Sequence, residues 1–470
     1  MTIVFFISIA SFLGLLIISG LLRNPGNLLV IYLVGLPIYT ISLSILYNYT
    51  GSHTLIKAIQ PWKEVLAFLV LIIAGVGILL KFRFKSLILL DYLIFIYLSL
   101  NILYLIVPLG SDFLVRLYGM RANAFFVVIY LLGRFVPLTL RQQKIIFKSL
   151  VGIGALAGFV VIVEIVALPV DWPARIGLMK YLNAFFGIEP IGHYGLTWTF
   201  ETSTAIRRYS AFFANPLELA SSTIITGAAA FFAIFSFKRQ TRGRLFSIIS
   251  FILISLSLLL AISRASLVAF FILLPVMCIW LQKVRLGLFI LLIAVIGIGG
   301  LLVFADPGLI EFTWETVSFQ NTSSQGHLQG WIEGARAILE YPFGLGLGTS
   351  GHVGSRFGNQ VGGENQFIII GVELGILGMT LYISILILSI YYALRAFHIT
   401  EGITKGLCFV AAASKFGLLI PTFTAHIEVY IFAMFISWWL VGFSIQQLRS
   451  PILVGRLNPK SKELILENSN

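Results

Sequence analysis

The chain has 470 residues, of which 59% are hydrophobic and only 11% are charged, and its mean hydropathy is +0.99. Soluble domains carry about 25% charged residues, so this composition excludes an ordinary soluble protein. The apolar residues form continuous blocks near the ~20 residues that a helix needs to cross a bilayer, whereas the strands of a membrane β-barrel alternate. We therefore expect an all-α, polytopic integral membrane protein, because helices satisfy their own backbone polar groups in lipid.

The apolar blocks predict about 13 transmembrane helices, with a range of about 12–14. In chain order the blocks cover residues 2–22, 28–47, 65–80, 87–109, 122–140, 146–168, 217–236, 245–262, 267–281, 287–304, 366–391, 405–422 and 427–446. The first block lacks a basic region and a small-residue cleavage site, so we expect a span and not a cleaved signal. Residues 1–446 are expected to form a single membrane domain, followed by a polar tail at 447–470.

The net charge of +13 is unevenly distributed between the two sides of the membrane. When alternate connections are assigned to the cytoplasm, the inner connections and the tail hold 19 of the 32 Lys and Arg, although the outer connections are far longer. Lys and Arg are retained on the cytoplasmic side, so this excess predicts an outer N-terminus and a cytoplasmic C-terminus. It accounts for the basic charge without nucleic acid, and the expected partner is the lipid bilayer.

Two outer connections, residues 169–216 and 305–365, are long and rich in Trp, Gly, Pro and ionisable groups. Loops of this length are usually functional in compact proteins, so we expect them to cover an active site. The second loop contains a predicted amphipathic helix at 328–340. The residues expected to share one face of this helix are Trp331, Ala335, Ile338 and Leu339.

Few ionisable or sulfur-containing side chains lie inside the predicted spans. Arg134, Asp91 and Glu164 do so, and we expect them to pair internally because isolated charges are costly in lipid. Cys278 and Cys408 also lie within apolar blocks, so neither a disulfide framework nor a metal cluster is expected.

Arginines at the predicted membrane surface are candidates for binding an anion. Arg207 and Arg208 open a run that leads through Pro216 directly into a span. A planar guanidinium can bind two oxygens of a phosphate or pyrophosphate at once. The alternative is that these side chains only anchor the protein at lipid headgroups.

Arg264 lies in a connection between two spans that is almost too short to be a loop, Ser263-Arg264-Ala265-Ser266. We therefore expect it at membrane depth, where an ionisable group is costly and usually functional. An anionic lipid-linked substrate would compensate its charge.

The end of the second long loop carries two further features. Residues 344–351 are rich in glycine but lack the Gly-Lys-Ser/Thr ending of a nucleotide-binding loop. They are either backbone that packs against a sugar or lipid, or a purely structural turn. Glu364 precedes a helix expected to begin at residue 366, where it could act as a general base or cap the helix.

Four motifs in this order resemble the O-antigen ligase and polysaccharide polymerase superfamily over about residues 200–380. They are the run Arg208–Pro216, the pair Ser263-Arg264, the segment Trp331–Gly346, and Glu364-Asn365 followed by Glu373–Gly378. The resemblance implies a membrane-embedded glycosyltransferase of the C-type architecture in a bacterial inner (plasma) membrane. Its donor would be a polyprenyl-pyrophosphate-linked oligosaccharide, it would need neither metal nor other cofactor, and other polysaccharide-assembly proteins would be candidate partners.

The resemblance also implies a set of site residues. The candidate catalytic residues are Glu364, Arg264 and His327, and the candidate substrate-binding residues are Arg207, Arg208, Arg336, His352 and Asn365. Two positions depart from the family pattern. His327 stands where the family commonly has arginine, so Arg336 or His352 would have to replace a phosphate contact. Glu364 stands where the family commonly has histidine, and this change keeps a possible base.

Polymerisation of lipid-linked repeat units into a surface or secreted polysaccharide is the function that we expect. A ligase that transfers a finished glycan to a lipid or protein acceptor uses the same donor chemistry and stays open. A polysaccharide or lipid transporter is the alternative of another class. Against it stand the lack of an internal repeat, the few charges within spans and the long outer loops.

Overall fold

The computed structural model describes residues 17–79, 87–202, 205–236, 242–304, 322–358 and 360–448, together with residues 14, 318 and 320. Within these ranges the secondary structure is helical, and the only β-type pairing is an isolated bridge between Glu201 and Arg207. The expected all-α membrane architecture is therefore confirmed.

Eight segments of the described chain are long and apolar enough to cross a membrane, judged by length and composition. They are His53–Gly75, which joins α4 (His53–Ile59) to most of α5 (Trp62–Leu79), α6 (Leu89–Ile106), α7 (Phe113–Phe135), α8 (Leu140–Val166), α11 (Pro216–Ser236), α12 (Arg242–Ala261), α18 (Gln366–Ile399) and α19 (Gly402–Thr424). A bent pair, α2 (Asn27–Gly35) and α3 (Tyr39–Thr50), meets at 60° and would add a ninth span. The shorter apolar helices are α13 (Arg264–Trp280), α20 (Ile431–Gln447) and the Val284–Ile293 part of α14 (Val284–Phe304).

These helices follow the predicted blocks from 28–47 onward, whereas most of block 2–22 lies outside the described residues. The total of 13 spans therefore stays a prediction. The clearest shift concerns the predicted span 122–140, because α7 begins at Phe113 and ends at Phe135. Arg116 made the first two turns of α7 look like a loop. Its Nη1 instead donates to the carbonyl oxygens that end α6, those of Leu105 at 2.8 Å and Val107 at 2.6 Å.

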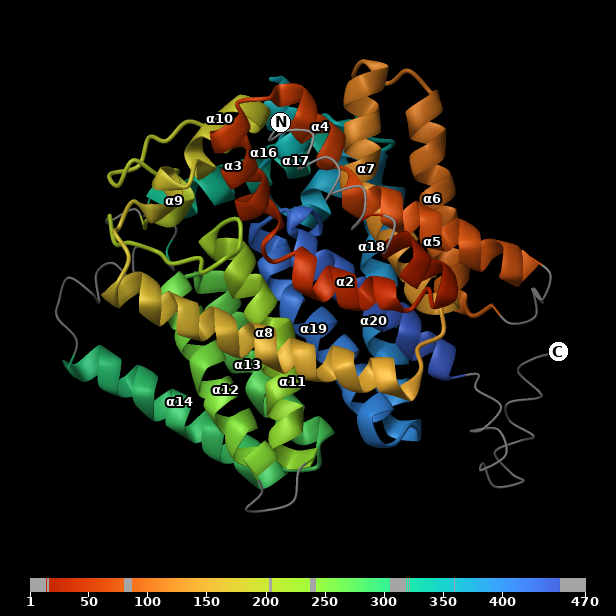
Figure 1. The fold of residues 1–470 in the computed structure, drawn as a ribbon. Coiled ribbons are helices and arrows are strands. Elements are labelled where there is room, and N and C mark those ends of the chain that lie inside the picture. Colours follow the sequence, from red (N-terminus) through yellow and green to blue (C-terminus); the bar gives the residue numbers. More distant parts are fainter. Residues whose placement is uncertain are drawn as a thin grey trace, which may run out of the picture.

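In the bundle, α18, α19 and α20 lie in the middle, with α11–α13 on one side and α5–α7 on the other, while α2 and α8 cross in front of them (Figure 1). Helices α7 and α20 pack with their backbones in contact. A Cβ at Gly133 would lie 2.1 Å from the carbonyl oxygen of Trp439, and one at Gly442 would lie 2.3 Å from that of Tyr130. Small residues at such crossings are typical of membrane helices, where close packing replaces the hydrophobic effect.

Two of the charges inside the spans pair with each other, as predicted. Arg134 Nε lies 3.3 Å from Asp91 Oδ1, and Tyr130 Oη donates to the same oxygen at 2.5 Å. The other oxygen of Asp91 accepts from the backbone N–H of Ile88 at 2.9 Å. A buried ion pair with these additional hydrogen bonds avoids the cost of an isolated charge in lipid.

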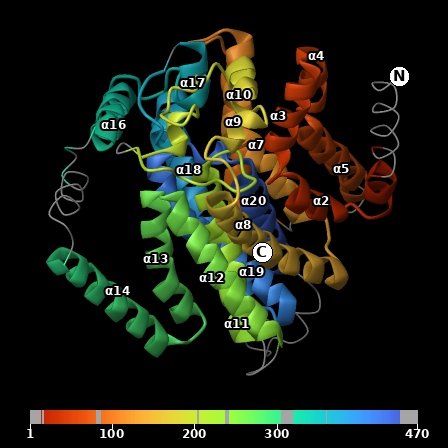
Figure 2. The same ribbon diagram turned by 60° about the vertical axis from the view of Figure 1, so that its left-hand side comes forward.

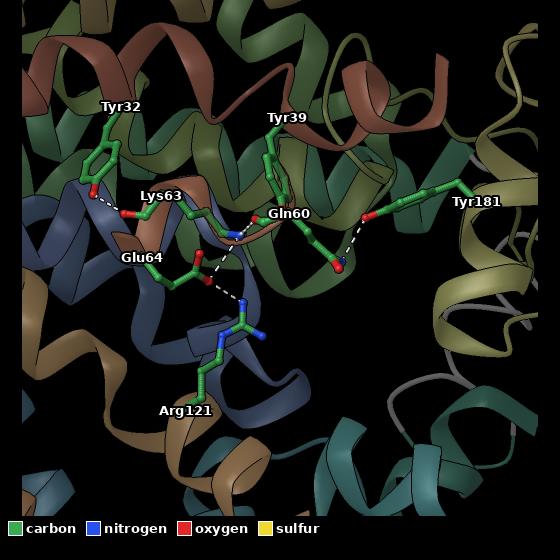
Figure 3. Close-up of polar contacts among 7 residues, drawn as sticks. All are labelled: Tyr32, Tyr39, Gln60, Lys63, Glu64, Arg121 and Tyr181. Carbon is green, nitrogen blue, oxygen red and sulfur yellow. Dashed lines mark hydrogen bonds and ion pairs between the residues drawn. The ribbon is translucent and has the colours of Figure 1, made fainter. Parts of the chain in front are cut away.

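A separate network of charged and polar side chains joins the first helices to a loop helix, α10 (Leu178–Phe186) (Figure 3). Lys63 Nζ lies 3.3 Å from Glu64 Oε1, and the same carboxylate binds Arg121 on α7. One turn away, Gln60 Nε2 donates to Tyr181 Oη on α10 at 3.2 Å. One carboxylate oxygen thus holds two cations from different helices, and these contacts tie α5, α7 and α10 together.

Short helices gather at one end of the bundle in both views (Figures 1 and 2). We call this end the loop layer; it contains α9 (Trp172–Arg175), α10, η2 (Trp198–Phe200), α16 (Thr322–Glu340) and α17 (Gly351–Phe357). Both predicted long loops contribute to it. Part of the second loop, residues 305–317, lies outside the described residues.

Helix α16 starts earlier than predicted, and its packed face differs from the predicted one. Ile338 is buried and Trp331 is half-buried as expected, but Ala335 and Leu339 are exposed. The buried positions instead include two glycines one turn apart. A Cβ at Gly330 would lie 2.7 Å from the Cα of Gly363, and one at Gly334 would lie 2.1 Å from Cγ2 of Ile368. Close backbone contact, which an apolar-face pattern does not detect, determines the orientation of the helix.

The glycine-rich stretch packs against a kink in α18. Gly375 inside that helix has φ = 71°, and the opened backbone accepts hydrogen bonds from the stretch. Leu345 N donates to Val372 O at 2.7 Å, and Gly346 N donates to Glu373 O at 3.1 Å. Gly346 itself has φ = 101°, which strongly favours glycine. These contacts favour the structural alternative for residues 344–351.

Candidate functional site

Charged and polar side chains from five separate segments converge where the loop layer meets the bundle. We call them the polar cluster: Arg208, Arg264, His327, Glu364 and Tyr430. They come from the loop before α11, the first residue of α13, α16, the segment before α18 and the residue before α20. Each member shifts the pKa of another member or has its own pKa shifted by one, so we treat the five groups as one neighbourhood.

The segment that carries Arg208 is held from three sides. Arg208 N donates to Phe200 O at 2.8 Å, and Tyr209 N donates to Leu260 O, at the end of α12, at 3.2 Å. On the third side lies the buried carboxylate of Glu164 at the end of α8, which accepts from Trp172 Nε1 at 2.9 Å and faces the backbone that follows Tyr209. Glu164 is therefore used within the protein, as predicted, and it fixes the position of the arginine segment.

The two adjacent arginines point in different directions. Arg207 is buried within its own loop, where Nη1 donates to Phe200 O at 3.2 Å and the guanidinium lies 5.5 Å from the ring centroid of Tyr209. Arg208 instead lies close enough to Arg264 and Tyr430 for their charges to act on it, which neither does on Arg207, while Nε of both arginines has no hydrogen-bond partner among the described residues. Burial lowers the pKa of Arg208, and the positive charge of Arg264 lowers it further. The structure brings Arg208, but not Arg207, to the polar cluster.

Arg264 is presented by a tight break between α12 and α13. Ile262 has φ = 48°, a left-handed conformation that is rare for a β-branched residue. Ser263 is extended, and its hydroxyl lies 3.2 Å from that of Ser266 in the first turn of α13. The strained turn places a half-buried guanidinium beside a second one. Such strain is maintained only where the surrounding structure requires it, and it is common at functional sites.

His327 contributes a neutral imidazole. It lies on α16 with its ring centroid 6.4 Å from that of Trp331. Burial lowers the pKa of His327 below its usual value; the Glu364 carboxylate partly opposes this shift, and Arg264 adds to it. An imidazole with a lowered pKa is unprotonated near pH 7 and can accept a proton.

Glu364 does not cap the following helix. Asn365 occupies that role, because its Oδ1 accepts from Phe367 N at 2.9 Å and from Ile368 N at 3.3 Å. Asn365 is buried, so it positions the start of α18, while the neighbouring Glu364 is half-buried in the polar cluster. The capping alternative that the sequence left open for Glu364 is thus wrong.

Sequence reasoning missed Tyr430. Burial raises its pKa, as do the charges of Glu364 and Glu218, whereas Arg208 acts in the opposite direction. Glu218 on α11 accepts from Phe432 N at 3.3 Å and so ties the start of α20 to this region. Nothing in the local sequence marks this tyrosine, because its neighbours come from distant parts of the chain.

Two predicted binding residues lie away from the polar cluster. Arg336 is exposed on α16 and lines a cavity described below. His352 on α17 is exposed and stacks on His426, with centroids 5.5 Å apart and planes at 6°. His426 is buried, and neither of its ring nitrogens has a hydrogen-bond partner among the described residues. Neither Arg336 nor His352 is placed to replace a phosphate contact beside His327.

The chemistry available in the polar cluster is anion binding and proton transfer. Two guanidinium groups can hold an anion with several oxygens, and an imidazole and a carboxylate beside them can accept a proton. Among the described residues, no group of three or more His, Cys, Asp or Glu is arranged to hold a metal ion.

Comparison with known proteins gives a family match over part of the chain. Residues 249–383 match the family model described as O-antigen ligase. No curated protein matches the chain. The match confirms the resemblance to the O-antigen ligase and polymerase superfamily and supports a glycosyltransferase-like function of that general type on a lipid-linked glycan. The matched segment contains Arg264, His327 and Glu364, and it excludes Arg208 and Tyr430.

Proposed function

From the match to the O-antigen ligase family, we propose that this protein is a membrane-embedded glycosyltransferase that polymerises lipid-linked oligosaccharide repeat units at the outer face of a bacterial inner membrane. The observation that carries the proposal is the convergence of two arginines, a neutral histidine and a carboxylate at the junction of helices and loop layer. In this proposal the loop layer faces outside and covers the site, within a single membrane domain that ends in a cytoplasmic tail.

The two arginines bind the donor pyrophosphate. In the reaction, the acceptor hydroxyl oxygen forms a bond to the anomeric carbon of the donor sugar, and the bond from that carbon to the pyrophosphate oxygen breaks. The leaving polyprenyl pyrophosphate keeps the electron pair, so negative charge develops on it. Arg208 and Arg264 stabilise this charge from fixed positions, an effect that is usually a large part of catalysis. No metal ion is needed in this scheme.

Glu364 takes the proton of the acceptor hydroxyl. Its side chain is half-buried, and the cap of α18 is supplied by Asn365, so the carboxylate is available for chemistry. His327 is the second candidate, because its lowered pKa keeps the imidazole neutral and the Glu364 carboxylate lies close enough to affect it. In either case the pair shares one site with the arginines.

A ligase is the second candidate function, and the match to a family of O-antigen ligases favours it. The two functions share the donor chemistry and differ in the acceptor. Deletion of the gene separates them. Loss of a polymerase leaves single-unit lipid intermediates, whereas loss of a ligase leaves full-length glycan on the carrier lipid.

Substitution tests the site itself. We expect Arg264→Ala to lower the rate roughly 100-fold or more and Arg264→Lys to restore only part of it, because an ammonium lacks the bidentate fork. Glu364→Gln should abolish the product at unchanged protein level, and Glu364→His should retain measurable activity. Arg175→Ala is the matched control, since this arginine lies in the loop layer but is exposed and paired with Asp171 at 2.9 Å. If the Arg264→Ala protein is present at the normal level and makes the full amount of product, Arg264 only anchors the protein at lipid headgroups.

If Glu364→Gln behaves like the unmodified protein, the base is not Glu364. His327→Gln then becomes the decisive substitution, since this histidine is the other proton acceptor of the polar cluster. Loss of activity in that variant alone would transfer the role to the imidazole.

A further inference from the structure

A cavity of about 570 Å³ lies along α16, separate from the polar cluster. Four polar side chains form its wall: Gln329, Glu333, Arg336 and Glu340. Its floor consists of Ala337, Leu345 and Val361, which belong to a small apolar cluster between α16 and α18. The volume falls within the range of about 300–1,000 Å³ that is usual for ligand sites. We call this cavity the α16 groove.

The polar wall is a regular ladder along one side of the helix. Residues at positions i, i+4, i+7 and i+11 share a face, and 11 residues of helix span ~16 Å. This is long enough for several linked sugar rings. His327 lies two residues before Gln329 and projects to the opposite side of α16. The α16 groove and the polar cluster are therefore adjacent along one helix but face different directions.

The chemistry of the α16 groove differs from that of a phosphate site. Its charged groups are two carboxylates and one guanidinium, so the wall carries a net negative charge that disfavours pyrophosphate. Carboxylates, an amide and a guanidinium are suitable hydrogen-bond partners for hydroxyl groups. Tyr341 stands at one end with 52% of its surface exposed, next to the apolar floor. An amphipathic aromatic ring and an apolar floor suit the C–H faces of sugar rings.

We propose that the α16 groove binds the saccharide part of the lipid-linked substrate, an uncharged oligosaccharide, while the pyrophosphate is held by the polar cluster. This inference rests on the proposed function and adds to it the place and the chemical class of the glycan. Arg336 then contacts sugar hydroxyls and not phosphate. Because α16 carries both His327 and the ladder, a bound glycan would run along the helix that supplies one side of the reaction site.

Binding to the full-length protein in detergent tests the inference without relying on turnover. The first probe is a neutral repeat-unit oligosaccharide, released from the polysaccharide of the producing strain and freed of lipid and phosphate. The second probe is inorganic pyrophosphate. Glu333→Ala and Tyr341→Ala each remove one contact, and we expect each to weaken oligosaccharide binding about tenfold while pyrophosphate binding stays unchanged.

Two controls separate the α16 groove from the rest of the protein. Arg175→Ala alters an exposed side chain of the loop layer that is paired with Asp171 and lies outside the cavity, and it should change neither binding event. Arg264→Ala should weaken pyrophosphate binding and leave oligosaccharide binding intact. Tyr341→Phe keeps the ring and should bind the oligosaccharide almost as well as the unmodified protein, which also controls for folding.

The outcomes distinguish failure of the inference from failure of the proposed function. The proposal that the α16 groove binds the saccharide is wrong if the unmodified protein does not bind the oligosaccharide. It is also wrong if the Glu333→Ala and Tyr341→Ala proteins bind the oligosaccharide as well as the unmodified protein does. Pyrophosphate binding that survives Arg264→Ala, together with full product in cells, overturns the proposed role of the polar cluster instead. Loss of both ligands in a groove variant shows that the two sites are not separate and also rejects the inference.

Discussion

Replacing either of two adjacent arginines should have opposite consequences. Arg207 is 7% exposed and donates to backbone carbonyl oxygens of its own loop. Arg208 lies close enough to Arg264 for that positive charge to lower its pKa, and no such effect reaches Arg207. We expect Arg207→Ala to destabilise the protein with little direct effect on chemistry, and Arg208→Ala to slow the chemistry strongly without destabilising the protein.

The magnitudes follow from these surroundings. A hydrogen bond to a charged group contributes about 1.5–3 kcal/mol. Arg207→Ala removes two such bonds, so it should lower the unfolding free energy even though an unpartnered Nε is removed with them. Both substitutions remove an Nε donor whose lack of a partner costs about 1–3 kcal/mol, but only Arg208→Ala also relieves repulsion from Arg264. This relief offsets the lost packing, so the melting temperature should stay the same or rise. Removing a fixed cation from the leaving group should cost about 2.7–4 kcal/mol, or 100- to 1,000-fold in rate.

Both variants can be compared in one preparation. Thermal unfolding of the detergent-solubilised protein gives the melting temperatures, and membranes with equal amounts of folded protein give the rate of glycan transfer. Arg208→Lys should recover part of the rate, because it keeps the charge but not the planar fork. If Arg208→Ala melts at a clearly lower temperature and its activity falls only in proportion to folded protein, Arg208 is structural and the reasoning is refuted. An inactive but stable Arg207→Ala protein would contradict it equally.

Two other expectations concern pH and topology. Burial holds the pKa of His426 well below its usual value, so below about pH 6.5 the unfolded chain binds a proton that the folded protein does not, and the unfolding free energy should fall by up to ~1.4 kcal/mol per pH unit. His426→Asn should reduce this slope in melts between about pH 7.5 and 5, and an identical slope would contradict the assignment. For topology, labelling from outside the cell should reach a cysteine at the exposed position Gln325 and miss one at Thr241, beside the basic cluster 238–244. Ser324, one residue earlier, is unsuitable because it is buried, and the reverse labelling pattern would invert the protein in the membrane.

The sequence was sufficient for the properties that depend on composition along the chain. Continuous apolar blocks predicted the helical membrane fold and most helix positions, since each span must be apolar along its whole length. The same reading misplaced the start of α7, where Arg116 looks like a loop residue until the carbonyl oxygens that it binds are known. Motif order predicted a resemblance to a family whose model matches residues 249–383, and Arg264, His327 and Glu364 were singled out from it.

Tertiary structure decided how the individual side chains are used, because that depends on partners far away in sequence. Arg207 and Arg208 are two neighbouring residues of the same type, yet only Arg208 is near Arg264, because Arg207 is held by carbonyl oxygens of its own loop. Asn365, not Glu364, caps α18, a choice that depends on where one side-chain oxygen lies relative to two backbone amides. The apolar pattern of α16 did not predict the face that packs, because backbone contact at glycines leaves no hydrophobic signal. Tyr430 could not have been found at all, because its neighbours meet only when the helices pack.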